Sequence, residues 1–244
     1  MSRDYRPILT IVLLLAFLFM TAGRLVAQSS HEDLVHNYGA WFMVFGRGSF
    51  VRLHPGLRDL RWWLDVQARF LDDSDYDQGL IRPGIGYAIK DEITIWIGYA
   101  YVHSDPTVGG DFDEHRVWQQ FLWSTKFAPA GFQSRTRLEQ RFVETGTDMG
   151  WRFRQLFRVT YPFDFEPRLG LAAYDELFFD LNDTDWGANA GFVQNRLFVG
   201  PSWKIDQKGR NTVEIGYLNQ FFRNEGRSDK LNHIFSVNLL LNFN

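Results

Sequence analysis

The chain contains no cysteine among its 244 residues. Disulfide bonds, thiol catalysis, Cys-ligated zinc and a bacterial lipoprotein anchor are therefore excluded. The formal net charge is only −3, so no basic surface indicates binding to nucleic acid. Walker, Rossmann and zinc motifs are also missing, and we expect no cofactor. Beyond the N-terminus the chain lacks a long apolar run, a low-complexity tract and a helical hydrophobic period.

The one long apolar run covers residues 8–20 and follows two arginines. Small residues come next, which gives the charged, apolar and cleavage regions of a secretory signal peptide. The run of 13 residues is shorter than the roughly 20 that a bilayer-spanning helix needs. We expect residues 1–27 to be a cleaved signal peptide and residues 28–244 to form one exported domain. A cut after Gly23 and retention as a membrane anchor are the alternatives.

The rest of the chain alternates between apolar and polar residues, which indicates β-strands. Every second residue from Ile93 to Tyr101, for example, is isoleucine or tyrosine. Short turns alternate with longer connections along the chain, as in a meander whose two ends face different surroundings. The pattern predicts an all-β, antiparallel, up-and-down transmembrane β-barrel.

A soluble β-sandwich would alternate in the same way, but three features favour the barrel. Glycines such as Gly84 and Gly98 lie on the polar faces, where they would leave room for arginines from across a crowded lumen. Aromatic residues collect near strand ends on the apolar faces, as in interfacial girdles. The last segment alternates and ends near Phe243, which resembles the signal read by the outer-membrane assembly machinery. We therefore expect location in the bacterial outer membrane, with this machinery, membrane lipids and lipopolysaccharide as partners.

The strand count depends on residues 36–54. We count ten strands from residue 60 onward, and single-chain bacterial barrels have an even number of strands. A split at residues 46–48, which read Gly-Arg-Gly, adds His36–Phe45 and Ser49–His54. We therefore predict about twelve strands, with ten as the second choice.

Residues 135–144 read Arg-Thr-Arg-Leu-Glu-Gln-Arg-Phe-Val-Glu, with charges at alternate positions from 135 to 141. In a strand these charges point to one face. An arginine at the middle of a bilayer costs roughly 2–4 kcal/mol, so we expect this face to line the lumen. The same alternation assigns thirteen cations and five anions to the lumen. They are Arg61, Asp65, Arg69, Arg82, Glu114, Arg116, Lys126, Arg135, Arg137, Glu139, Arg141, Arg152, Arg154, Arg158, Arg168, Glu176, Arg196 and Glu214.

A lumen of this charge has two interpretations. It is either a narrow anion-preferring channel or a structural web of Arg–carboxylate pairs that closes the barrel. The leading function is accordingly structural or passive, or that of a small selective channel. The predicted charge network consists of Glu114, Arg116, Arg135, Arg137, Glu139, Arg141, Arg152, Arg154, Glu176, Arg196 and Glu214.

Several motifs follow one another along the chain. They are Glu114–Gln120, Arg135–Arg141, Arg152–Arg154, Asp175–Phe178, Gln194–Arg196 and Gly216–Gln220. In this order the chain resembles the bacterial family called domain of unknown function 2490, over essentially the whole mature chain. The resemblance implies an outer-membrane β-barrel and implies no activity.

A rim enzyme is the alternative function. His103 and His115 flank a loop that begins with Ser104 and ends beside Asp113. A Ser–His–acid arrangement is therefore conceivable, and a lipid-modifying enzyme could use it at the extracellular rim. Any loop rich in Asp and Ser offers the same residues, so we assign no catalytic residue.

The long loops are acidic, and Asp73, Asp75 and Asp77 have the spacing of a calcium loop. However, Gln78 stands where that loop needs glycine, and Gly84 stands where its closing glutamate belongs. No metal site is therefore predicted. Solvated loops, or divalent ions that bridge these carboxylates to lipopolysaccharide phosphates, are the two remaining interpretations.

Overall fold

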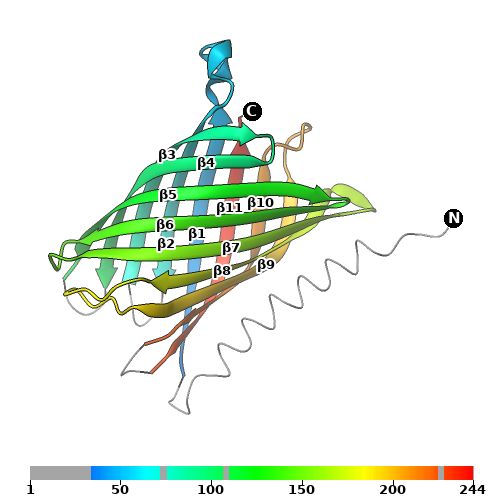
Figure 1. Ribbon diagram of the computed structural model, residues 1–244. Helices are drawn as coiled ribbons and strands as arrows, with labels where there is room; N and C mark the ends of the chain where they lie inside the picture. Colours follow the sequence, from blue (N-terminus) through cyan, green and yellow to red (C-terminus); the bar gives the residue numbers. More distant parts are fainter. Residues whose placement is uncertain (1–33, 72–75, 107–109, 225–227, 244) are drawn as a thin grey trace.

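The computed structural model describes residues 34–71, 76–106, 110–224 and 228–243. In these residues eleven strands form one closed barrel, which confirms the predicted all-β, up-and-down fold (Figure 1). The predicted signal peptide lies outside the described residues. The strands are β1 (Val35–Ser49), β2 (Leu60–Leu71), β3 (Tyr76–Lys90), β4 (Ile93–Pro106), β5 (Phe112–Phe127), β6 (Ala130–Val143), β7 (Met149–Phe163), β8 (Glu166–Asp180), β9 (Gly191–Lys204), β10 (Thr212–Phe222) and β11 (Lys230–Asn242).

The described strands number eleven rather than the predicted twelve, because residues 36–54 contain one strand instead of two. β1 continues through Gly46 and Gly48, where the indole of Trp62 packs against the backbone. A Cβ atom added at Gly48 would lie 2.6 Å from Nε1 of Trp62. The two glycines therefore accommodate a neighbouring ring and do not mark a turn.

After β1 the chain forms two short 3-10 turns, Phe50–Arg52 and Pro55–Leu57, where the prediction had a second strand. Ser49 Oγ accepts a hydrogen bond of 3.1 Å from the amide N–H two residues on. His54 Nδ1 accepts one of 3.0 Å in the same way. These side chains satisfy the first free N–H groups of each turn, so turns replace an extended strand here.

The closing seam of the barrel is a parallel pair. β1 pairs with β11 from Val35 opposite Lys230 to Arg47 opposite Asn242. Neighbouring strands of an up-and-down barrel alternate in direction, so an odd number brings the first and last strands together in the same direction. All other neighbouring pairs in the described barrel are antiparallel.

The two faces of the wall have opposite character. The outer face carries large apolar side chains in the open, among them Ile85 at 56%, Ile97 at 55% and Phe235 at 55% exposure. The inner face carries charges, and Arg137 and Glu139 are both 0% exposed. Strand alternation produces this division directly. No helix in the described residues is long and apolar enough to cross a membrane.

Glycines of β3 and β4 make room for a tryptophan rather than, as predicted, for arginines from across the barrel. A Cβ atom at Gly98 would lie 2.2 Å from Cζ2 of Trp118, and one at Gly84 would lie 2.5 Å from Cη2 of the same ring. Trp118 packs with Trp63 and Trp96 in one buried cluster. One side of the lumen is therefore aromatic, and it faces the charged residues.

The connections distinguish the two ends of the barrel. The links after β3, β5, β7 and β9 are turns of two to seven residues, and we call their side the short-turn end. The link after β1, residues 50–59, lies at the same end and contains the two 3-10 turns. The link after β8 covers residues 181–190 and lies at the opposite side, which we call the loop end. Asp73 and Asp75 of the calcium-like sequence lie outside the described residues.

Candidate functional site

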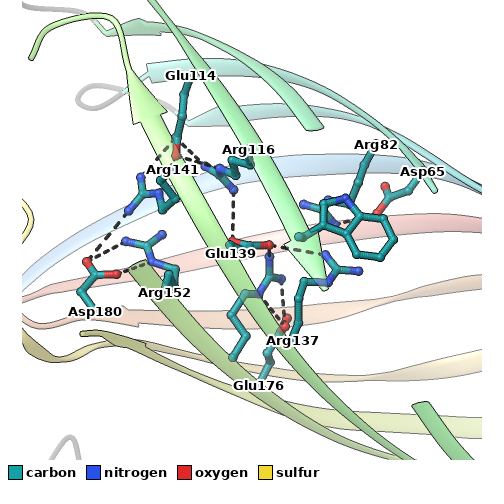
Figure 2. A network of polar contacts seen from close by, with 12 residues as sticks. Asp65, Arg82, Glu114, Arg116, Arg137, Glu139, Arg141, Arg152, Glu176 and Asp180 are labelled. Carbon is teal, nitrogen blue, oxygen red and sulfur yellow. Dashed lines mark hydrogen bonds and ion pairs between the residues drawn. The ribbon is translucent and has the colours of Figure 1, made fainter. Parts of the chain in front are cut away.

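The centre of the lumen is occupied by a buried carboxylate and the arginines around it (Figure 2). Glu139 Oε1 accepts a hydrogen bond of 2.7 Å from Arg154 Nη1 and lies 3.5 Å from Arg137 Nη1. Glu139 Oε2 lies 3.8 Å from Arg116 Nη1. Three strands, β5, β6 and β7, supply these four side chains, so the contact ties neighbouring parts of the wall together inside the barrel.

Arg137 connects the carboxylate to the aromatic side of the lumen. Its Nε and Nη2 donate to Gln120 Oε1 at 3.0 and 2.7 Å. Its guanidinium carbon lies 4.5 Å from the centre of the Trp118 ring, which allows a cation–π interaction in a dry environment. Gln120 and Trp118 were not among the predicted site residues. The alternation of Glu114 and Arg116 along β5 extends to both of them and could have identified them.

A second carboxylate extends the network toward the short-turn end. Glu176 Oε1 accepts from Arg135 Nη2 at 2.7 Å and from Arg154 Nε at 2.9 Å. Arg154 therefore bridges Glu139 and Glu176, and its guanidinium lies 4.5 Å from the centre of the Phe178 ring. Buried charges are stable in a protein only when they are paired and hydrogen-bonded, as these are.

A third group of charges lies toward the loop end. Glu114 accepts paired hydrogen bonds from Arg116, at 2.8 and 2.6 Å, and from Arg141, at 2.5 and 3.1 Å. Arg152 donates to both oxygens of Asp180 at 2.6 and 3.0 Å. Arg141 and Asp180 are 3.9 Å apart, which connects the two groups.

Asp180 is a network member that was not among the predicted lumen residues. β8 extends to this residue, and its side chain is only 4% exposed. The alternation from Glu176 through Phe178 to Asp180 indicates that Asp180 lies on the same inner face of β8 as Glu176. The aspartates that follow, Asp183 and Asp185, do belong to the loop, so the sequence does not separate Asp180 from them.

The loop at residues 181–190 packs against the β6–β7 turn at the loop end. The Trp186 ring lies 4.9 Å from the guanidinium of Arg141, and its Nε1 donates to the Asp148 carbonyl at 2.8 Å. Asp185 accepts hydrogen bonds from the Thr147 N–H and Oγ, both at 2.8 Å, and from the Asp148 N–H at 3.1 Å. These contacts fix Trp186 over the charged network.

The remaining predicted network members come from β7, β9 and β10. Arg158 pairs with Glu214 across the barrel. The Arg196 guanidinium lies between the rings of Trp41 and Phe178, at 4.9 and 4.6 Å from their centres. Arg168, which the alternation had also assigned to the lumen, is 60% exposed because it lies at the start of β8.

A cavity of about 420 Å³ lies in the lumen. We call it the chamber. Its lining includes nine cationic side chains and three carboxylates, together with aromatic rings from β1, β2 and β8. Gly209 and Arg210 from the β9–β10 turn also line it, so the chamber extends to the short-turn end. The charged network separates it from the loop end.

The residues of the alternative catalytic site do not come together. His103 Nδ1 lies 2.8 Å from Asp113 Oδ1, and His115 contacts Tyr99, all on the outer face of the wall. Ser104 points to the inner face, is 2% exposed and accepts a hydrogen bond of 2.9 Å from Gln78. Among the described residues, no three His, Asp or Glu side chains are grouped so that they could hold a metal ion.

Comparison with known proteins agrees with the resemblance drawn from the motifs. Residues 38–232 match the family described as "Protein of unknown function (DUF2490)". An uncharacterized protein of Methylorubrum extorquens is 37% identical over 194 residues, which cover 78% of this chain and 84% of that protein. No solved structure matches the chain significantly. The chain therefore belongs to the DUF2490 family.

Proposed function

We propose that this protein is a bacterial outer-membrane β-barrel with a structural or passive role, and that its lumen is closed to free diffusion. One observation carries this proposal. Arg137 and Glu139, both 0% exposed, meet in the middle of the lumen and are tied to β5 and β7 by further pairs. Arginines that are paired in this way fill space rather than line an open passage.

The outer face supports the membrane location. Large apolar side chains such as Ile85 and Ile97 are exposed along the strands, and a soluble protein rarely exposes apolar surface this continuously. Cell fractionation should recover the protein in the outer membrane, as a band that migrates differently when it is not heated. Recovery from the soluble periplasm would refute the location.

Outer-membrane lipids and lipopolysaccharide are the partners that this location implies. The assembly machinery is a third partner, through β11, whose outer face carries Phe235 in the open. Depletion of that machinery should lower the folded, unheated band while the total amount of exported chain falls less. An unchanged folded fraction would remove the assembly machinery from the list of partners.

Conductance across planar bilayers distinguishes the closed barrel from the narrow anion-preferring channel. We expect the purified, folded protein to give no steps, because the network spans the lumen. Protease protection of the reconstituted barrel must first show that it has inserted. Stable anion-selective steps from the inserted wild type would favour the channel and refute the closed barrel.

A further inference from the structure

The chamber is a feature of the lumen that the structural role does not explain. Its three carboxylates, Asp65, Glu176 and Glu214, are each already paired. Asp65 accepts from Arg82 at 2.9 Å, Glu176 accepts from two arginines, and Glu214 pairs with Arg158. Two of the nine cations also pair with carboxylates outside the lining, Arg154 with Glu139 and Arg210 with Asp206. The chamber still keeps an excess of positive charge.

Part of this excess is not committed to any carboxylate. Arg47 lines the chamber from β1, and its guanidinium pairs with no carboxylate in the described residues. Lys204 Nζ donates to the backbone carbonyl of Pro167 at 3.1 Å and pairs with no carboxylate in the described residues. Arg47 and Lys204 are partly buried, so their charges are screened less than in open solvent and attract an anion more strongly.

Residues that line the chamber also carry buried hydrogen-bond donors without acceptors. The Nε1 atoms of Trp41 and Trp63 and the Nε atoms of Arg82 and Arg135 are buried in the wall and have no partner in the described residues. All four residues line the chamber, and the Arg82 side chain is only 3% exposed. Every one of these atoms is a donor, so they add positive rather than negative potential beside the chamber.

The walls add an apolar component. Trp41, Phe45, Trp63 and Tyr174 contribute rings, and Leu156 contributes an aliphatic side chain. The volume of about 420 Å³ is in the range of small-molecule sites. Inorganic ions would contact the cations but would leave these surfaces unused.

We propose that the chamber binds a small organic anion that carries a carboxylate or phosphate group on a compact apolar body. Arg47 and Lys204 would neutralise the anion, and the rings of Trp41 and Trp63 would enclose the body. The ligand would enter from the short-turn end, because Trp186 and the charged network cover the loop end. Under the proposed function that end faces the periplasm.

Binding to the purified, folded barrel in detergent tests the proposal, with phenyl phosphate as the probe. Inorganic phosphate, which has only the anionic group, and benzyl alcohol, which has an aromatic ring without the charge, are the two control compounds. Calorimetry should show one site for phenyl phosphate, with an affinity at least about tenfold above that of either half, because charge and apolar contact act together. No saturable binding of phenyl phosphate, or equal affinity for inorganic phosphate, would overturn the proposal.

Two variants connect binding to the chamber. Arg47→Gln should weaken phenyl phosphate binding about tenfold, since a charge-assisted hydrogen bond is lost. Arg52→Gln, at an exposed position outside the chamber, is the matched control and should bind like wild type. Thr160→Trp keeps every charge but fills the chamber, so it should abolish binding even if Arg47→Gln fails to fold. Wild-type affinity in Thr160→Trp would refute the site.

This inference rests on the proposed function only for the side from which the ligand enters. Binding in detergent depends neither on location nor on conductance. A barrel that conducts ions would therefore refute the closed lumen alone. A silent outer-membrane barrel that fails to bind phenyl phosphate would refute the chamber alone.

Discussion

Arg154 reaches Glu139 diagonally across two neighbouring strands, with 2.7 Å between Nη1 and Oε1. The residue directly opposite Glu139 on β7 is Arg152. However, Arg152 pairs with Asp180 on β8, the other neighbouring strand of β7. Arg152 therefore pairs with the residue directly opposite it on β8, Arg154 pairs diagonally with Glu139 on β6, and the pairs interlock. This arrangement makes Glu139 the anion on which several buried cations depend.

Removal of Glu139 should therefore be costly. Glu139→Ala leaves Arg154 and Arg137 without their shared anion, and loss of one partner from a buried pair costs about 3–5 kcal/mol. We expect a clear fall in the temperature at which the folded band disappears on unheated gels. A Glu139→Ala barrel as heat-resistant as wild type would refute the role of the network in stability.

Gln140→Ala is the matched control on the outer face of the same strand. Gln140 exchanges two hydrogen bonds of 3.0 Å with Gln119, which are worth about 1 kcal/mol each. We therefore expect it to destabilise the barrel less than Glu139→Ala does. The opposite order would mean that the outer amide pair, and not the lumen, holds the wall together.

Gly98→Ala should destabilise the aromatic side of the lumen. Its Cβ would lie 2.2 Å from the Trp118 ring and 2.4 Å from the Pro83 carbonyl oxygen, and the backbone atom has little freedom to move. Overpacking of this kind costs about 1–3 kcal/mol. Gly79→Ala on β3 meets no atom within 4 Å and should be nearly neutral. Equal thermal stability of the two variants would show that Trp118 can shift without cost.

The contact between the β8–β9 loop and the β6–β7 turn should weaken in acid. Hydrogen bonds from the Thr147 N–H, the Asp148 N–H and the Thr147 hydroxyl lower the pKa of Asp185. A lowered pKa means that the contact is complete above the ordinary aspartate pKa and is lost as the pH falls through the lowered value. Acrylamide quenching of Trp186, taken as the difference between wild type and Trp186→Phe, should rise over that interval.

Asp185→Asn supplies the control for this titration. Its amide can still accept from Thr147 but does not gain a proton in this range. The acid-dependent rise in Trp186 quenching should therefore disappear. If the rise persists in Asp185→Asn, another group opens the loop.

The two rim histidines should be dispensable for lipid composition. Ser104 faces the lumen while His103 and His115 face outward, so no nucleophile–base pair forms among them. Cells that carry the double change His103→Ala and His115→Ala should have the same outer-membrane lipids as wild type by mass spectrometry. A lipid species that is lost in this variant and returns with either histidine would restore the enzyme as a candidate.

The alternation of apolar and polar residues along the chain predicted much of this fold. It assigned Arg137 and Glu139 to one face and Leu138 to the other, because successive side chains of a strand point in opposite directions. The strand count was wrong by one, since the capped turns after Ser49 resemble a short strand in composition. The rule that single-chain bacterial barrels have an even number of strands then favoured twelve. Because β1 and β11 pair in parallel, this barrel closes with an odd number of strands.

The sequence by itself determined the barrel class, the family and the face on which most of the charges lie. Only the tertiary structure decided which charges meet, because register and closure place residues from distant strands opposite one another. Asp180 and Trp186 entered the site in this way, one at the end of β8 and one in the loop that folds over Arg141. The chamber likewise forms only when the barrel closes, because residues from many strands line it.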